Sequence, residues 1–503
     1  MAVCNPPGAS SLIGQTSTSC LQKFTIHFRR PEILKQNKNA PYKGEYGFDW
    51  LRDEYIYPME VVLADMWSSI PRNLNMVTPL CKDPINLRKE YLPNVESPEK
   101  EFKPHGQDYY PAWLSIFACN VQVDNADAGS NMHEHGVYLD LQLEEIDEII
   151  NDNTEIFFKP SVPCLKITPE KISISEFLKT KREKQIIDNR DKQLEIYYYY
   201  YKLENAVKII CQGDTLKQHE EIKVFAKLGS NEYEVGQLMV YQNNEIGKAN
   251  IIVVNVITEY DKNNNKVIPQ SHPSLKNLYN CQSFNQAMIQ VDINTRENFD
   301  LFALKKKHHD VKKFFEDIDD PNYLDGTRPK MKKRRIDPAE DIRKRLCALY
   351  EKYGKYAPKG KRIKDGGHYN TYLLFTNLSP GGGALGIVQL NKKKFKGTYE
   401  WGNMFVIFAN ALTDDHTIVH EAAHSFTLPH IFEHHTNINN KPIFYQGYTE
   451  NYMDYTWLYK DIYNDKDYST NKYNGQMYSF FKWQWDLMRN DKKSIKFPKK
   501  QEE

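Results

Sequence analysis

The pattern His420-Glu421-Ala422-Ala423-His424 constrains the fold of this 503-residue chain more strongly than any other part of the sequence. Capping candidates precede it at residues 413–415, and apolar residues fill the positions around it, which predicts a helix. Because successive residues of a helix turn by about 100°, His420 and His424 project from one face, a turn apart. Two imidazoles so placed can bind one metal ion, with Glu421 beside it.

A third histidine, His430, follows the same helix. On a continuous helix it would point about 240° away from His424, so binding of one metal by all three histidines requires the helix to end between them. Pro429 disfavours a helical conformation at Leu428 and thereby supplies that end. The sequence thus predicts a three-histidine metal site.

Residues 420–430 resemble the HExxHxxGxxH zinc site of the metzincin metallopeptidases, and the resemblance extends over about residues 275–490. Downstream, Tyr452-Met453-Asp454-Tyr455 is similar to the family's tight turn with a methionine beneath the zinc ligands. The resemblance implies one Zn²⁺ per chain, held by His420, His424 and His430. It also implies that Met453 forms an apolar floor and that Tyr455 ligates zinc or stabilises an oxyanion.

A glycine-rich segment, residues 381–386, resembles the part that precedes the family's substrate-binding edge strand. The strand expected after it contains Gly386, Ile387 and Val388. Main-chain pairing with such a strand orients an extended peptide without demanding a particular sequence. These three residues are therefore the candidate substrate-binding residues.

One position departs from the family pattern. The family's glycine after the second histidine adopts a positive φ, whereas the residue here is Thr427, which is β-branched and disfavours that conformation. Either the turn is built differently around Pro429, or His430 is not the third ligand. The alternative ligands are Glu433, His434, His435 and Glu450.

Three neutral histidines leave one tetrahedral position for water, and zinc lowers the pKa of that water from 15.7 toward about 7. Glu421 is then expected to act as the general base and to deliver the proton to the leaving amine. The oxyanion is assigned to the metal, with the help of Tyr455. We therefore predict a zinc-dependent metalloendopeptidase that acts on a protein or peptide substrate.

The amino-terminal half reads as short strands separated by turn residues, which predicts two antiparallel β-sandwich modules. The second half mixes strands with helices such as residues 341–353, which predicts an α+β, metzincin-like catalytic domain. The charged stretch 176–192 is expected to be a loop or helical excursion, and 197–201, five tyrosines, to be a strand. The expected divisions are a tail (1–20), a β-rich domain (21–163), an Ig-like sandwich (164–260), a linker (261–274), the catalytic domain (275–495) and a charged tail (496–503).

Composition excludes several classes of protein. The net charge of +1 gives no global field for nucleic acid, and the basic residues 332–335 are expected to be a solvated insertion. A mean hydropathy of −0.68 and the lack of a long apolar run speak against a membrane span. The start has no signal-peptide pattern, and the eight cysteines form no CxxC pair, so reduced thiols are expected.

Other histidines have simpler interpretations. His416 is expected to make a surface or capping contact at the start of the helix. His133 and His135 share one face of a possible strand but lack a third ligand nearby, so an ordinary loop or strand pair is favoured. Residues 473–488 are expected to form a helix that packs its aromatic side chains into the catalytic domain.

The block 44–55 (GEYGFDWLRDEY) resembles the leading domains of bacterial proteins associated with type VI contractile secretion. The resemblance implies a chain that is cytoplasmic before export by a signal-independent route, with a secretion-apparatus component and an immunity or inhibitor protein as partners. Two alternatives remain open: a non-enzymatic secretion or binding component with a structural zinc site, and a zinc amidase acting on cell-wall peptides.

Overall fold

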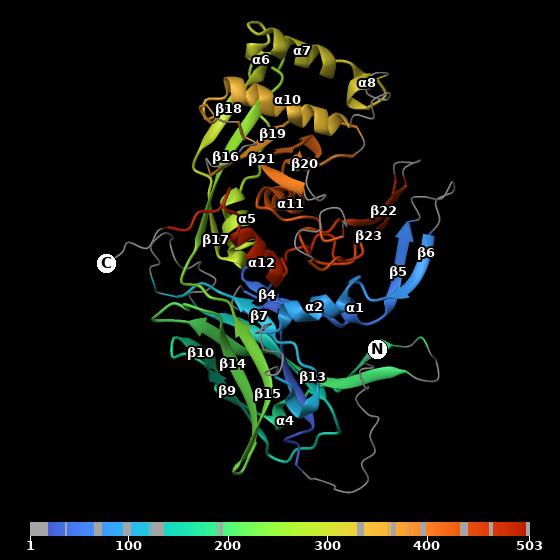
Figure 1. The fold of residues 1–503 in the computed structure, drawn as a ribbon, viewed down its shortest axis with the longest axis vertical. Helices are drawn as coiled ribbons and strands as arrows, with labels where there is room; N and C mark the ends of the chain where they lie inside the picture. The colour runs from blue at the N-terminus through green and yellow to red at the C-terminus, as the bar shows by residue number, and fades with distance from the viewer. Residues whose placement is uncertain are drawn as a thin grey trace.

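Most of the chain is described by the computed structural model, and its strands form two large assemblies (Figure 1). One is a sandwich of two sheets in the lower part of the view, and the other is a mixed sheet covered by helices in the upper part. The described residues are 19–35, 38–64, 73–93, 102–119, 121, 135–188, 190, 195–328, 337–360, 362–363, 369–381, 383–392, 399–432, 441–461 and 466–498.

The sandwich joins strands that are far apart in the sequence. Its first sheet has the order β1-β8-β13-β10, with β12 also paired to β13, and its second has the order β11-β9-β14-β15-β7-β4. Side chains of both sheets form one apolar core. The strands are β1 (Phe24–Arg29), β4 (Gly47–Asp49), β7 (Ala112–Ser115), β8 (Val137–Glu145), β9 (Glu155–Pro160), β10 (Leu165–Thr168), β11 (Lys171–Ser173), β12 (Glu183–Asp188), β13 (Ile196–Cys211), β14 (Glu220–Leu228) and β15 (Asn231–Val240).

The prediction of two sandwiches divided near residues 160–163 is wrong. Strands before that point pair with strands after it: β8 with β13, and β9 with β14. The strands were recognised because alternation of apolar residues reveals burial, but alternation does not reveal which strands pair. The sheets are also not purely antiparallel, because β7 and β15 run parallel.

The third sheet has the order β17-β16-β19-β21-β20, with β18 also paired to β16. All its pairs are parallel except that of β20 with β21, so β20 is an antiparallel strand at one edge. The strands are β16 (Gly247–Ile257), β17 (Ile289–Asp292), β18 (Arg296–Asp300), β19 (Asn370–Thr376), β20 (Gly386–Lys392) and β21 (Tyr399–Ile407).

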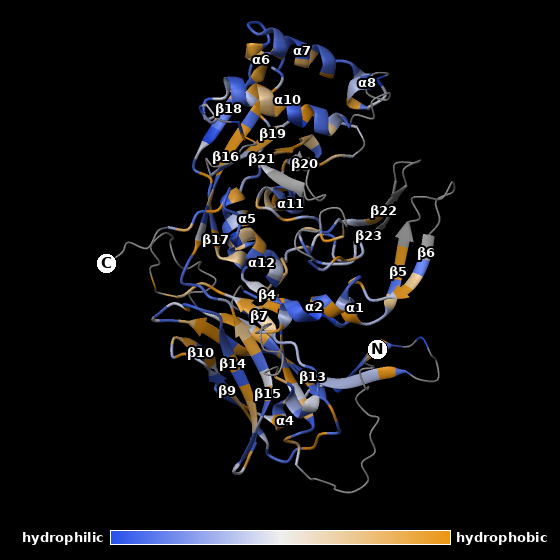
Figure 2. Ribbon diagram, in the orientation of Figure 1, coloured by the Kyte–Doolittle hydropathy of each residue, from blue (hydrophilic) through white to orange (hydrophobic). Residues whose placement is uncertain are grey.

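Helices cover both faces of this sheet. On one face α7 (His309–Ile318) and α10 (Pro338–Tyr353) pack on Val254, Leu374 and Val406. On the other face α5 (Leu275–Cys281), α11 (Asp415–Ser425) and α12 (Lys482–Arg489) pack on Val253 and Phe375. Figure 2 shows hydrophobic residues along β16 and a mostly hydrophilic α7.

The boundary of the expected catalytic domain also differs from the prediction. Residues 261–274, expected to be an interdomain linker, connect β16 to α5 within the same assembly, because β16 is the inner strand of the third sheet. The side chains of Ile251–Val254 are buried on both faces of β16. A continuous apolar run of this kind is typical of a parallel strand that is covered on both faces. The expected terminal tails are shorter too: Cys20 is buried, and Lys496 pairs with Lys248 of β16.

Residues from the first hundred positions complete the core beneath α11. The helices α1 (Asp53–Ile56) and α2 (Pro84–Tyr91) and the hairpin of β5 (Met59–Ala64) with β6 (Asn73–Thr78) lie in this part of the chain. Two backbone hydrogen bonds join it to the carboxy-terminal region: Lys82 N–H donates to Ile443, and Tyr445 N–H donates to Leu80. Its fully buried side chains in that core include Tyr55, Val61, Leu80 and Leu87.

The remaining predictions have mixed outcomes. The helix expected over residues 341–353 is confirmed within α10, whereas 473–488 is helical only from Lys482. The charged stretch 176–192 contains the end of α4 (Ile174–Leu178) and strand β12, and the five tyrosines lie on β13. The seven described cysteines are free thiols. None of the helices among the described residues has the length and apolar character needed to cross a bilayer, and most of the basic section 327–336 lies outside the described residues.

A fragment of residues 245–498, which lacks the amino-terminal part, should not fold cooperatively. Among the buried side chains that it loses are those at positions 55, 61, 80 and 87, each of which contributes about 2 kcal/mol by burial, whereas domains are stable by only about 5–15 kcal/mol. Thermal unfolding followed by near-ultraviolet circular dichroism, with the full chain as control, tests this. A cooperative transition in the fragment would contradict it.

Candidate metal centre

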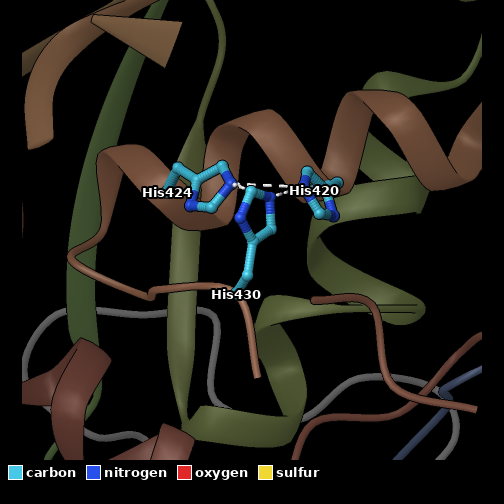
Figure 3. Close-up of side chains that lie close together, drawn as sticks. All are labelled: His420, His424 and His430. Atoms are coloured by element: carbon cyan, nitrogen blue, oxygen red, sulfur yellow. Dashed lines mark hydrogen bonds between the residues drawn. The ribbon is translucent and has the colours of Figure 1, made fainter. Parts of the chain in front are cut away.

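The helix α11 carries the first two histidines and begins as its sequence predicts. The side chain of Asp414 at the N-cap accepts a hydrogen bond from Thr417 N–H at 2.7 Å. Ile418, Val419 and Ala422 pack toward the sheet and are fully buried, which fixes the rotation of the helix about its axis. His420 and His424 therefore point away from the sheet, on the face that Figure 3 displays.

The chain leaves the helix through Thr427, which has a φ of +77°. The sequence predicted that a β-branched residue would disfavour this conformation, and the structure adopts it nonetheless. Thr427 N–H donates to the carbonyl of His424 at 2.9 Å, and the Thr427 side chain is hydrogen-bonded to Asp491. These contacts, with Pro429 after them, hold a turn whose backbone strain is on the order of 1–3 kcal/mol.

The turn brings His430 back to the helix, so that the three imidazoles face one another (Figure 3). The Nε2 atoms of His420 and His430 lie 3.0 Å apart, those of His424 and His430 3.1 Å apart, and those of His420 and His424 3.2 Å apart. Among the residues that the structure describes, no other group of three His, Cys, Asp or Glu side chains brings its ligand atoms together in this way.

Backbone carbonyls fix the tautomers of two of these histidines. Nδ1 of His420 donates to the carbonyl of Tyr452 at 2.7 Å, and Nδ1 of His424 donates to the carbonyl of Leu428 at 2.6 Å. A carbonyl can only accept, so in the neutral rings the proton is on Nδ1 and the lone pair is on Nε2. Metal-binding histidines commonly make this contact, because it sets the ring orientation and raises ligand basicity.

These residues fit a zinc ion. Lone pairs that converge at about 3 Å repel one another unless a cation lies between them. Nitrogen ligands 2.0–2.1 Å from a tetrahedral Zn²⁺ are about 3.3 Å apart, close to the separations found here. Three protein ligands would also leave the fourth position open, as in catalytic rather than structural zinc sites.

Burial keeps the candidate ligands neutral. Desolvation lowers the pKa of His420 and of His424 well below the ordinary histidine value, and the neighbouring imidazoles lower it further. The pKa of Glu421 is raised to about 8 by burial, against the opposing effect of a hydrogen bond from the backbone N–H of Val388. A nearby cation would favour the ionised form of Glu421, as a general base requires.

Glu421 lies directly against the edge strand β20. A Cβ atom on Gly386 would come within 2.7 Å of Glu421 Cγ and within 3.1 Å of Thr417 Cγ2, so only glycine allows α11 to approach β20 this closely. Val388, two residues along, contacts the Glu421 carboxylate through its N–H. Gly386 and Val388 are thus brought to the site, while Ile387 between them packs against the core on the other face of the sheet.

The loop that carries Met453 is folded around a buried carboxylate. Asp454 accepts backbone hydrogen bonds from Gly447 (2.7 Å), Thr449 (2.9 Å) and Tyr455 (2.8 Å). Burial raises the pKa of Asp454 to about 6 even though these hydrogen bonds oppose the change. Met453 is fully buried, and its carbonyl accepts Ile431 N–H at 3.3 Å, directly after His430.

Tyr455 lies next to the histidines, as its position in the motif suggested. Its ring centroid is 5.0 Å from that of His430 and 5.9 Å from that of His420. Phe432 and Trp457 pack on it at 4.8 and 4.9 Å. These half-buried aromatic rings form a wall beside the metal centre.

The alternative third ligands have different outcomes. Glu450 is paired with Arg30 and Arg52; although burial opposes it, the positive charges of both arginines lower the pKa of this glutamate to about 2. Glu433, His434 and His435 lie outside the described residues, as does His133. His416, expected to make a surface or capping contact, is half-buried, and its ring lies against Tyr452 and His420, with centroids 6.2 and 5.6 Å apart.

Sequence reasoning missed the residues that orient the ligands. Tyr452 and Asp454 belong to the turn that was recognised in the sequence, so the motif could have indicated that both residues lie near the histidines. The pairing of Glu450 with Arg30 and Arg52 had no sequence signal, since it joins residues about 400 positions apart. Comparison with protein-family models, curated proteins and solved structures gives no match for this chain.

Replacement of His430 by alanine should weaken zinc binding by at least about 100-fold, because one of three ligands is lost. His272→Ala is the matched control, since His272 bonds Asp415 at the start of the same helix (2.8 Å) but is not part of the triad. Zinc affinity by chelator competition measures the effect. Equal affinities for the wild type and His430→Ala would exclude His430 as a ligand.

Proposed function

We propose that this protein is a zinc-dependent metalloendopeptidase. The observation that carries the proposal is the convergence of three histidine Nε2 atoms at 3.0–3.2 Å beside a buried glutamate that lies against an edge strand. The metzincin resemblance of residues 420–430 and of the Met453 turn supports it. The antiparallel edge strand β20 supports it too, because the resemblance places the substrate strand there.

In this proposal His420, His424 and His430 would hold one zinc ion, which when bound acts as a Lewis acid toward a carbonyl and lowers the pKa of water. Glu421 would accept a proton from the attacking water and deliver it to the amine that leaves when the peptide bond breaks. Tyr455, whose ring centroid lies 5.0 Å from that of His430, would donate its hydroxyl to the oxygen that gains negative charge. β20 would align an extended substrate by main-chain pairing.

An intact Glu421 favours a catalytic site over a structural one, because retention of zinc needs only the histidines. Burial raises the pKa of this glutamate to about 8, and carboxylates with perturbed pKa values are common in functional sites. A cell-wall amidase would use the same groups on a different amide bond. The type VI secretion likeness, with its export route and immunity partner, remains a prediction.

Replacement of Glu421 by alanine should keep one zinc per chain and reduce cleavage of casein or a peptide library by about 10²–10⁴-fold, because only the general base is removed. Zinc content and cleavage are measured on the same preparations. Zinc in both proteins with cleavage in neither would favour the structural site. Cleavage of cell-wall peptides but not of proteins would favour the amidase.

Replacement of Gly386 by alanine should also reduce cleavage, by about 100-fold, while zinc content stays unchanged. The added Cβ would lie 2.7 Å from Glu421 Cγ and displace its carboxylate, and a displacement of about 1 Å costs about two orders of magnitude in rate. Leu385→Ala is the matched control, because this neighbouring side chain is 40% exposed. Full activity of Gly386→Ala would contradict the assigned position of the base.

A further inference from the structure

Glu450 is buried between two arginines of the amino-terminal part of the chain. Arg30 Nη2 lies 2.6 Å from Glu450 Oε2, and Arg52 Nη2 bonds Glu450 Oε1. The side chain of Glu450 is 7% exposed and that of Arg52 is 6% exposed, so the pair of Glu450 with Arg52 is shielded from solvent. Each carboxylate oxygen of Glu450 thus has its own guanidinium partner.

The two arginines are themselves held in place. The guanidinium of Arg52 stacks 3.7 Å above the ring of Trp50, and that of Arg30 lies 4.1 Å above the ring of Tyr42. Asp49 lies 3.7 Å from Arg52 and balances the second positive charge. Arg30 follows strand β1 of the sandwich, and Arg52 precedes helix α1, so both are anchored to elements outside the third sheet.

Glu450 connects this cluster to the metal centre through a short length of backbone. Two residues after it, the carbonyl of Tyr452 accepts Nδ1–H of His420. Between them, Asn451 accepts Met453 N–H at 2.9 Å through its side-chain oxygen and donates to Gln484 at 2.6 Å. The Glu450 carbonyl accepts Ser479 N–H at 3.3 Å. The loop has little freedom to move unless these contacts break.

A buried ion pair of this kind adds little net stability, because desolvation of the charges offsets their attraction. Its established benefit in some proteins is geometric, since charged partners specify one arrangement. Here the ion pair holds the loop two residues before the Tyr452 carbonyl. That carbonyl in turn sets the orientation and tautomer of His420.

We propose that Glu450 is a positioning residue through which Arg30 and Arg52 of the amino-terminal part orient His420 for metal binding. The sandwich then contributes to the metal centre itself, in addition to any role in recognition. This inference rests on the proposed zinc site but not on the peptidase reaction, so metal binding alone can test it.

The first test is the zinc affinity of Glu450→Gln in the full chain, measured by chelator competition. We expect binding to be about 10–100-fold weaker than in the wild type, the usual effect of removing a partner behind a metal ligand. We also expect the visible absorption spectrum of the Co²⁺-substituted protein to change, because the geometry of the ligands changes. A purely structural role would leave that spectrum as it is.

Two matched controls separate positioning from general destabilisation. Glu90→Gln breaks another ion pair between the amino-terminal part and the carboxy-terminal region, that of Glu90 with Lys441 at 2.8 Å, twelve residues before Met453 in the sequence. Val224→Ala removes a buried side chain from the sandwich core. Both variants should retain wild-type zinc affinity and the wild-type Co²⁺ spectrum, even where their unfolding temperature falls.

Arg30→Lys keeps the positive charge but loses the planar guanidinium. If Glu450→Gln does not fold, this variant tests whether the ion pair orients His420. It should weaken zinc binding several-fold. Wild-type affinity in whichever of the two variants is folded would overturn the proposal. A wild-type protein that binds no zinc would instead overturn the metal site and, with it, the proposed function.

Discussion

The arrangement around the metal centre depends on where the two Nδ1 protons of His420 and His424 go. Each is accepted by a backbone carbonyl, that of Tyr452 and that of Leu428, and this leaves both Nε2 lone pairs directed at a common point. The carbonyl of Leu428 lies in the turn after α11, and that of Tyr452 lies in the loop that carries Met453. Both segments must therefore be fixed relative to α11 before three imidazoles can serve one metal ion.

Two networks of buried polar groups provide this fixation. Asp454 accepts hydrogen bonds from backbone N–H groups of its own loop. Glu450 pairs the same loop with Arg30 and Arg52. Buried carboxylates are costly unless they are fully paired, so each of them restricts the loop to the one conformation that satisfies it. The turn after α11 also carries an energetic cost, because Thr427 has a φ of +77°, which is strained for a β-branched residue.

The amino-terminal half contributes to the core under α11 and to the loop that carries Glu450. Tyr55, Val61 and Leu80 complete the apolar core under α11, while Arg30 after β1 and Arg52 in the block around Trp50 hold Glu450. A division of the chain into an exporting module and an independent protease is difficult to reconcile with these contacts. The block 44–55 contributes Arg52 to the Glu450 ion pair and Tyr55 to the core that includes residues of α11.

The sequence by itself determined the local features of this protein. The helix, its two histidines on one face, the end of the helix before His430 and the β-rich character of the first half all follow from the periodicity of residues close in sequence. Gly386 was placed correctly on the strand next to the site, although its close approach to Glu421 was not foreseen.

Only the tertiary structure decided how distant segments combine. It merged two expected sandwiches into one, placed the inner strand β16 in the third sheet, made Thr427 adopt a conformation that its side chain disfavours, and paired Arg30 with a glutamate 420 residues away. The physical reason is that strand pairing and buried ion pairs depend on contacts across the fold. Local periodicity records whether a residue is buried but not which partner buries it.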